Sequence, residues 1–185
     1  MSELNVMGIS GSLRKGSFNT AVLRAAIELA PAGMTIVQHD IRDIPLYDDD
    51  VRAKGQPESV QRFRDAIAKA DALLVVTPEY NYSLPGVLKN AIDWASRPPQ
   101  QPFAGKPAAL MGASGGMSGT MRAQYHFRQV AVFLDLHVLS KPEVFVRNAG
   151  SLIDAEGKLT DEATRKVIAD QLVALAAWTK GLKNG

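Results

Sequence analysis

The chain has 185 residues, of which 46% are hydrophobic and 22% charged, so it is long enough for one domain with a buried core. It contains no cysteine, which excludes disulfides, thiolate metal sites and cysteine nucleophiles. Its net charge of +2 comes from scattered lysines and arginines, and this gives little reason to expect a nucleic-acid partner.

The first predicted element is a buried strand over residues 4–9, and a polar loop leads from it into a predicted helix over residues 20–29. The loop is rich in glycine and serine and contains Arg14. Its glycines permit sharp turns, the start of the helix presents unpaired N–H groups, and the planar guanidinium grips phosphate. The loop therefore predicts an anion site, and a turn that merely caps the helix is the alternative.

The spacing of this loop separates three kinds of phosphate site. A Walker loop ends in Gly-Lys-Ser/Thr, whereas the order here is Lys15-Gly16-Ser17. The dinucleotide fingerprint needs glycines at its first, third and sixth positions, and Gly8, Gly11 and Gly16 are spaced differently. What remains is a metal-free site for a terminal monophosphate, and riboflavin 5'-phosphate is a ligand of that kind.

Further along the chain we predict a strand over residues 34–39, a loop over 40–55 and a helix over 57–70. The loop contains three consecutive aspartates, 48–50. Their side chains point in different directions and lack a histidine or other clustered ligand, so we expect a solvated turn and no metal. The apolar run over 72–77 predicts the central strand of a parallel sheet.

The remaining predicted elements are a helix over 85–94, a strand over 107–113, a helix over 120–134, a fifth strand over 137–146 and a helix over 161–180. The fifth strand should be bent or interrupted near Lys141-Pro142, because proline cannot donate to a central ladder. Strand and helix thus alternate about five times, which predicts an α/β protein with a doubly wound parallel sheet.

Three polar loops, over residues 10–19, 78–83 and 114–119, each follow a predicted strand. The carboxyl ends of parallel strands meet at one edge of the sheet, so we expect the three loops to build one site. The second loop offers tyrosines and amides to a flat heteroaromatic ligand. In the third, glycines beside Ser114 allow close backbone approach to such a ligand.

A serine hydrolase using Ser114 is a further alternative, because residues 112–116 match the G-x-S-x-G elbow. The expected acid and histidine do not follow: Asp135 and His137 are two residues apart, and His126 precedes both. We therefore disfavour a hydrolase and take each histidine as structural.

Residues 11–19 and 78–94 together resemble the signatures of the NADPH-dependent FMN reductase family, above all its bacterial quinone and chromate reductases. The resemblance implies a flavodoxin-like, three-layer fold with five parallel strands in the order 2-1-3-4-5. It also implies an enzyme that binds FMN non-covalently, is reduced by NADPH or NADH, and passes electrons to quinones, azo or nitro compounds, or chromate. We expect ping-pong hydride transfer in which the flavin carries the chemistry and no side chain is catalytic.

Carried over by matching position, the resemblance implies thirteen cofactor-binding residues. The FMN phosphate would be held by Ser12, Arg14, Ser17, Phe18 and Asn19. The ribityl chain and ring would be lined by Pro78, Glu79, Tyr80, Asn81, Tyr82 and Ser83. Ser114 and Gly115 would face the pyrimidine edge.

The resemblance further implies a homodimer or homotetramer with the flavin at a subunit boundary. Arg122, Tyr125 and Glu143 match positions where we expect a polar contact between subunits, and surface charge is the alternative. The rival function is a flavodoxin-type electron carrier, although such carriers are strongly acidic and this chain is not. No apolar stretch reaches bilayer length and the N-terminus lacks an export signal, so we expect a cytoplasmic protein with one domain over residues 1–185 and no membrane contact.

Overall fold

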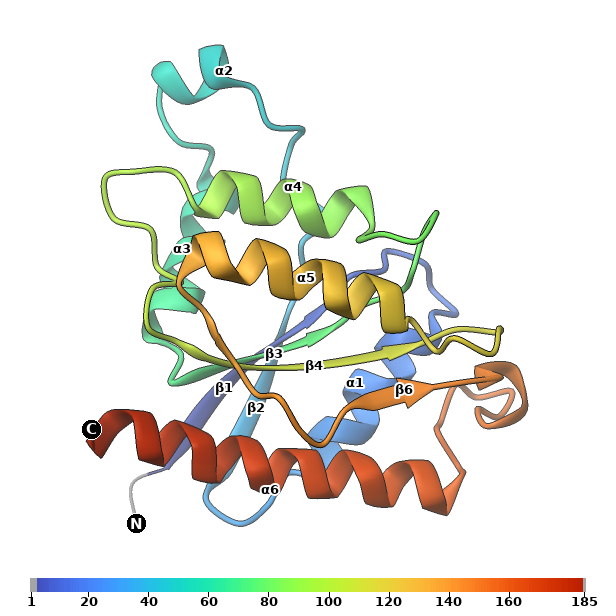
Figure 1. Cartoon of the computed structure of the whole chain (residues 1–185). Helices are drawn as coiled ribbons and strands as arrows, with labels where there is room; N and C mark the ends of the chain where they lie inside the picture. The colour runs from blue at the N-terminus through green and yellow to red at the C-terminus, as the bar shows by residue number, and fades with distance from the viewer. Residues whose placement is uncertain (1–2, 185) are drawn as a thin grey trace.

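The computed structural model describes residues 3–184 as a parallel sheet between two layers of helices (Figure 1). The strands are β1 (Leu4–Ser10), β2 (Met34–His39), β3 (Ala72–Val76), β4 (Pro107–Ala113), β5 (His137–Val138) and β6 (Val144–Val146). Every strand pair is parallel. The order β2-β1-β3-β4-β5 confirms the predicted flavodoxin-like topology.

The fifth position of the sheet is shared by two short strands. β5 pairs with the first half of β4 and β6 with its second half, and Lys141-Pro142 lies between them. The predicted interruption is therefore confirmed, since proline has no N–H with which to continue the ladder.

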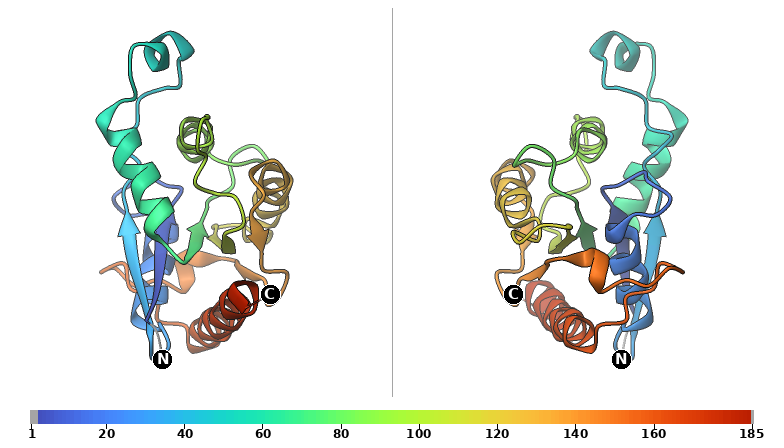
Figure 2. Two further views of the ribbon diagram at one scale, coloured as in Figure 1. Left: turned by 90° about the vertical axis from the view of Figure 1, so that its left-hand side faces the viewer. Right: turned by 90° about the vertical axis from the view of Figure 1, so that its right-hand side faces the viewer.

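Helices cover both faces of the sheet, as the end-on views show (Figure 2). One face is packed by α1 (Phe18–Glu28) and α6 (Glu162–Asn184), and the other by α3 (Glu58–Lys69), α4 (Gly86–Ala95) and α5 (Met121–Leu134). β3 and β4 are buried along their whole length, as expected for strands covered on both sides. None of the helices within residues 3–184 has the length and apolarity needed to cross a bilayer.

The expectation of an unbroken loop over residues 40–55 is wrong. A short helix, α2 (Asp49–Ala53), lies within this segment and projects away from the sheet (Figure 1). Asp48 caps it by accepting a hydrogen bond from the Asp50 N–H at 2.9 Å. Asp49 pairs with Arg52 across the first turn at 2.7 Å. An aspartate cap followed by acidic residues in the first turn is a helix-start signal, and it explains the acidic triplet.

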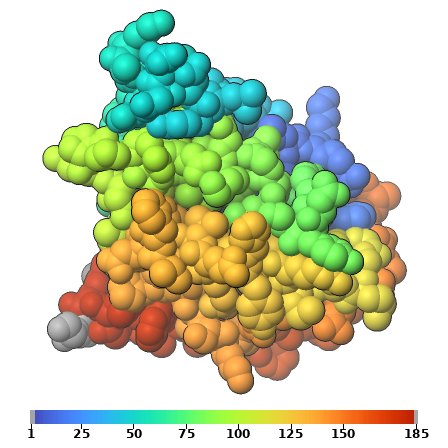
Figure 3. Space-filling model, turned by 45° about the horizontal axis from the view of Figure 1, so that its top comes forward, coloured from blue at the N-terminus to red at the C-terminus, as the bar shows by residue number. Residues whose placement is uncertain are grey.

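The carboxyl ends of β1, β3 and β4 all point to one edge of the sheet, at the right of Figure 1. The three polar loops singled out in the sequence leave the sheet at this edge, as the colours of Figure 3 show on the surface. Parallel pairing thus brings together segments that lie about a hundred residues apart in the chain.

Candidate functional site

The site begins at the N-terminus of α1. Ser17 caps this helix by accepting a hydrogen bond from the Thr20 N–H at 3.3 Å. The first intrahelical bond is made by Ala21, so the N–H groups of Phe18 and Asn19 precede the helical ladder. No acidic residue occupies the first turn. The positive end of the helix dipole therefore remains available to an anion.

Arg14 is folded over the loop that precedes α1. Its terminal nitrogen donates a hydrogen bond to the Gly16 carbonyl at 2.6 Å, and its guanidinium carbon lies 5.6 Å from the centroid of the Phe18 ring. The Ser10 and Thr20 hydroxyls, 3.0 Å apart, tie the start of this loop to the helix. The guanidinium is thus held beside the helix N-terminus, where it could pair with an anion.

A cavity of about 230 Å³ lies between the three loops. Ten of the thirteen residues proposed from the sequence line it: Ser12, Arg14, Ser17, Phe18, Asn19, Pro78, Glu79, Tyr80, Ser114 and Gly115. Asn81, Tyr82 and Ser83 are not among its lining residues. The volume is below the usual range for drug-sized ligands, so a flavin nucleotide would extend beyond the cavity toward the exposed rings of the second loop.

Ala113 also lines the cavity, and the sequence reasoning missed it. Asn19 donates a hydrogen bond from its side-chain nitrogen to the Ala113 carbonyl at 3.0 Å and accepts one from the Ala113 N–H at 2.9 Å. The buried amide therefore fastens α1 to the end of β4. Alanine carries no chemical signal of its own; its place just before the third loop is the only hint in the sequence.

The tip of the second loop is a tight hairpin between Tyr80 and Ser83, whose backbone groups exchange hydrogen bonds at 3.0 and 3.1 Å. Asn81 and Tyr82 form the turn with φ angles of 51° and 65°. A two-residue turn with positive φ at both positions is of type I′, which favours Asn at the first position and Gly at the second. Tyrosine at the second position holds a strained backbone with its ring exposed.

The side chain of Glu79 is only 8% exposed and fastens the second loop to α5. Its two carboxylate oxygens accept hydrogen bonds from Arg122 at 3.0 Å and from the Ala123 N–H at 3.1 Å. The guanidinium of Arg122 also lies 4.0 Å from the centroid of the Tyr82 ring, within the range of a cation–π contact. The side chain of Glu79 is therefore engaged within the protein.

The histidines and Ser114 do not assemble a triad. His126 Nδ1 lies 2.7 Å from the Ser83 hydroxyl, so this ring supports the second loop. The Ser114 hydroxyl donates to the Gly116 carbonyl and accepts from the Gly116 N–H, both at 3.3 Å. No histidine hydrogen-bonds Ser114 within residues 3–184, and the geometry does not support a hydrolase.

The three residues expected at a subunit contact lie on or beside α5. Arg122 is committed to Glu79 and Tyr82 as described above. Tyr125, exposed on the same helix, interacts with Glu143, and this interaction raises the pKa of the phenol above its usual value. The predicted contact between subunits remains a prediction.

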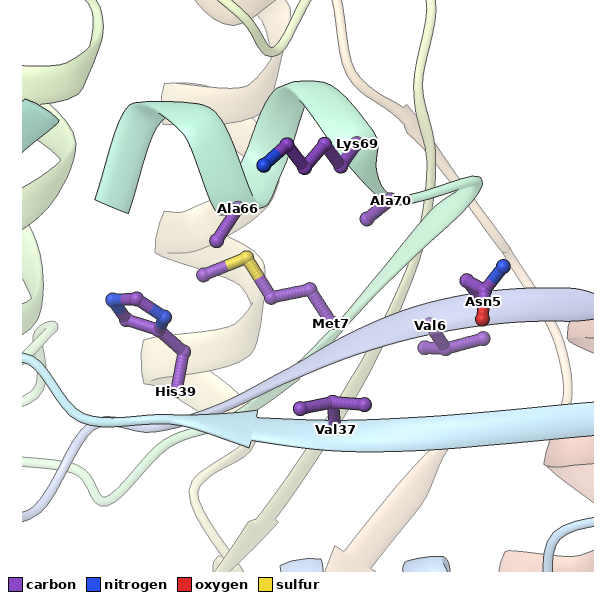
Figure 4. Close-up of a pocket in the computed structure, with 8 residues that line it drawn as sticks. All are labelled: Asn5, Val6, Met7, Val37, His39, Ala66, Lys69 and Ala70. Carbon is purple, nitrogen blue, oxygen red and sulfur yellow. The ribbon is translucent and has the colours of Figure 1, made fainter. Parts of the chain in front are cut away.

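Another hollow, of about 350 Å³, lies between the first two strands and α3, away from the three loops (Figure 4). Met7, Val37, Ala66 and Ala70 make its surface mainly apolar, with His39 and Lys69 beside them. It contains none of the site residues proposed from the sequence.

The loop site combines an open helix N-terminus, hydroxyl groups and an arginine with a second loop rich in aromatic rings. A ligand can approach the backbone of Gly115 closely, because the space where a Cβ would lie is open to 4 Å. Within the described residues no group of three histidine, aspartate or glutamate side chains is placed to hold a metal ion. These donors fit a phosphate joined to a flat ring, and with the topology they define a flavodoxin-like mononucleotide-binding protein.

Comparisons with known proteins agree with this class. The sequence profile of the NADPH-dependent FMN reductase family matches residues 4–151. An NAD(P)H-dependent FMN reductase of Pseudomonas aeruginosa is 59% identical over 181 residues, 98% of each chain. A quinone reductase of Escherichia coli is 46% identical over 187 residues, 99% of this chain and 100% of the other. The solved structure of FerB, a flavoenzyme NAD(P)H:(acceptor) oxidoreductase of Paracoccus denitrificans, superposes with a TM-score of 0.88 at 38% identity, covering 96% of this chain and 98% of its own.

The chain belongs to the NADPH-dependent FMN reductase family. It is an NAD(P)H-dependent oxidoreductase with FMN as its cofactor, as the resemblance in the sequence predicts.

Proposed function

We propose that the cavity between the three loops holds FMN, with its phosphate at the N-terminus of α1 and its ring along the second and third loops. The observation that carries this assignment is the gathering of ten of the thirteen proposed residues around one hollow. The unpaired N–H groups of the first helical turn and the Arg14 guanidinium would bind the phosphate. Phe18, stacked under Arg14, would keep that guanidinium in place.

When bound, FMN supplies the hydride chemistry, accepting a hydride from the nicotinamide and giving two electrons to the acceptor. The residues of this chain bind and orient it. Glu79 and His126 brace the second loop against α5, so the ring would meet a rigid surface. The third loop presents the Gly115 backbone to the polar edge of the ring, where N–H groups stabilise negative charge.

We further propose that quinones are the main electron acceptors of this protein. The relatives named quinone reductase or quinone oxidoreductase are 45–46% identical to this chain. A relative from a Burkholderia species, 44% identical, is named 2-hydroxy-1,4-benzoquinone reductase. A flat acceptor suits the same exposed surface, beside Tyr80 and Tyr82, on which a nicotinamide would stack. Chromate, azo and nitro compounds would be secondary acceptors.

Because both substrates would use one surface in turn, we propose a ping-pong sequence. The nicotinamide leaves before the acceptor arrives, and double-reciprocal plots at several quinone concentrations should give parallel lines. Intersecting lines would show that both substrates bind together.

The test of the function is steady-state consumption of NADPH by the FMN-loaded protein with a benzoquinone. We expect turnover, together with the visible absorbance of bound flavin in the purified protein. Flavin absorbance without turnover would leave a flavodoxin-type electron carrier as the function. Loss of both signals would contradict the cofactor site itself.

The phosphate assignment predicts that Arg14→Ala weakens FMN binding by about 1.5–3 kcal/mol, the usual loss for a charge-assisted hydrogen bond. Lys15→Ala removes the same charge from the neighbouring exposed position and should change the affinity far less. Fluorescence titration of the flavin-free protein measures both. Equal affinities for the Arg14 variant and the wild-type protein would remove Arg14 from the phosphate site.

We propose that the protein is a homodimer or homotetramer in the cytoplasm and that residues 1–185 act as one domain. The outer face of α5 supports self-association, because Tyr125, Val132 and Phe133 share one side of the helix and are 49%, 82% and 77% exposed. Tyr125 and Glu143 would take part in the polar contact between subunits, with Arg122 beside them. Analytical ultracentrifugation of the wild-type protein and of Phe133→Ser tests this assembly.

A further inference from the structure

A polar cavity of about 330 Å³ adjoins the proposed phosphate site on the side of β2. Its residues come from the end of β1, the first loop, α1, the end of β2 and the segment that follows β2: Ser10, Ser12, Arg14, Lys15, Thr20, Arg24, Gln38, His39, Asp40 and Arg42. In a doubly wound sheet, ligands bind outside the carboxyl ends of the strands, and this cavity lies at that edge. The flavin assignment above makes no use of it.

The cavity is strongly cationic. Arg14, Lys15, Arg24 and Arg42 line it, and Asp40 is its only carboxylate. Arg42 donates its Nε to Asp40 at 2.9 Å, which leaves both of its terminal nitrogens outside that contact. Among the described residues, neither Lys15 nor Arg24 takes part in an ion pair. Uncompensated cations around a polar hollow favour a phosphorylated ligand.

The position of the cavity narrows the choice of ligand. Ser12 and Arg14 line both this cavity and the flavin cavity, so the two hollows meet at the phosphate loop. A group attached to the far side of the FMN phosphate would therefore enter the cationic cavity. Its volume is at the lower end for ligand sites and suits one nucleotide unit.

We propose that this cavity is an adenylate subsite, so that the protein also binds flavin adenine dinucleotide. The second phosphate of the dinucleotide would lie between Arg24 and Arg42, and Thr20 and Gln38 would offer hydrogen bonds to its ribose. No bond forms or breaks in this step. The inference depends on the proposed position of the FMN phosphate.

The test compares FMN and FAD binding to the full chain after removal of flavin, by fluorescence titration. The double variant Arg24→Ala/Arg42→Ala should raise the Kd for FAD by about 10- to 100-fold, the loss of one to two charge-assisted contacts. Its Kd for FMN should change less than about threefold, because long-range charge effects are screened in 0.15 M salt. The control variant Arg52→Ala/Lys166→Ala removes two cations outside the cavity and should leave both constants near the wild-type values.

The possible results distinguish failure of the proposed flavin site from failure of the adenylate subsite. Absence of FMN binding by the wild-type protein would overturn the flavin site as a whole. Normal FMN binding with no FAD binding, or with FAD binding unchanged in the double variant, would overturn the adenylate subsite alone. If the double variant instead raises KM for NADPH but not for NADH, with FAD affinity unchanged, the cavity serves the 2'-phosphate of the reductant and the proposal is wrong.

Discussion

The backbone at Asn81 and Tyr82 shows how a single residue type can store strain at a site. Both residues lie in the left-handed region of backbone conformation, which is unfavourable for residues other than glycine, asparagine and aspartate. Asn81 suits its position, whereas Tyr82 does not. The Tyr82 ring compensates by packing against the Arg122 guanidinium and remains 70% exposed. An aromatic ring kept at this position at the expense of backbone geometry is consistent with contact to a flat ligand.

We predict that Tyr82→Val is less stable than Tyr82→Gly by about 1 kcal/mol. Both variants lose the aromatic ring, so the comparison isolates the backbone, where a β-branched residue tolerates positive φ poorly. Urea unfolding monitored by circular dichroism measures the difference. Equal stabilities would mean that the turn relaxes out of the left-handed region when valine is introduced.

At the scale of elements, the second loop and α5 behave as one unit. Glu79 accepts hydrogen bonds from the Arg122 side chain and from the Ala123 N–H in the first turn of α5, where a negative charge is favourable. His126, one turn further along, meets Ser83 at the other end of the loop. These contacts place the loop at a fixed height above the carboxyl end of β3. A shift of α5 would therefore move the loop with it.

The variant Glu79→Gln should lower the free energy of unfolding by about 1–3 kcal/mol, because Arg122 loses its carboxylate partner and the helix loses a negative charge at its N-terminus. In a double-mutant cycle, Arg122→Met combined with Glu79→Gln should cost less than the sum of the two single changes, with a coupling of about 0.5–2 kcal/mol. Chemical denaturation of the four proteins measures the coupling. Purely additive effects would mean that the pair contributes nothing in solution.

At the scale of the whole molecule, the two ends of the described chain meet at Asp71, just before β3. This carboxylate accepts a hydrogen bond from the Asn5 N–H at 2.8 Å and is paired with Lys183 near the end of α6. Burial alone would raise the pKa of Asp71, but the contacts with Lys183 and Asn5 outweigh it and lower the pKa below the ordinary value. The first strand, the central strand and the last helix are therefore joined at one charged group.

A carboxyl group whose pKa is lowered in the folded protein stabilises the fold above its unfolded pKa of about 3.9, and this stabilisation is lost as the pH falls through the folded value. We predict that Asp71→Asn lowers the free energy of unfolding by about 0.5–1.5 kcal/mol at pH 7 and has little effect near pH 2. Urea unfolding across this range measures it. The control Asp170→Asn, in an exposed pair with Lys166, should show a much smaller change. An Asp71 effect of the same size at both pH values would contradict the linkage.

Local patterns in the amino-acid sequence were sufficient to predict where the strands lie, the interruption near Pro142 and the three loops at one edge. Buried strands appear as apolar runs, proline cannot donate a hydrogen bond to the ladder, and a phosphate-binding loop is a continuous stretch of chain. The order of the strands in the sheet was implied only by the resemblance to the reductase family. The short helix α2 could also have been predicted from the sequence, because its aspartate cap and acidic first turn are local signals.

Only the tertiary structure showed which side chains of the site are already engaged in hydrogen bonds with other parts of the protein. Asn19 bonds to Ala113, 94 residues away, and Glu79 bonds to Arg122, 43 residues away. Such pairings depend on how helices pack over the sheet, which no local spacing specifies. The cationic cavity beside β2 also depends on this packing, because its arginines come from the first loop, α1 and the segment after β2. Spacing along the chain predicted the kind of phosphate site, whereas the packing of elements in space determined which side chains surround the loop.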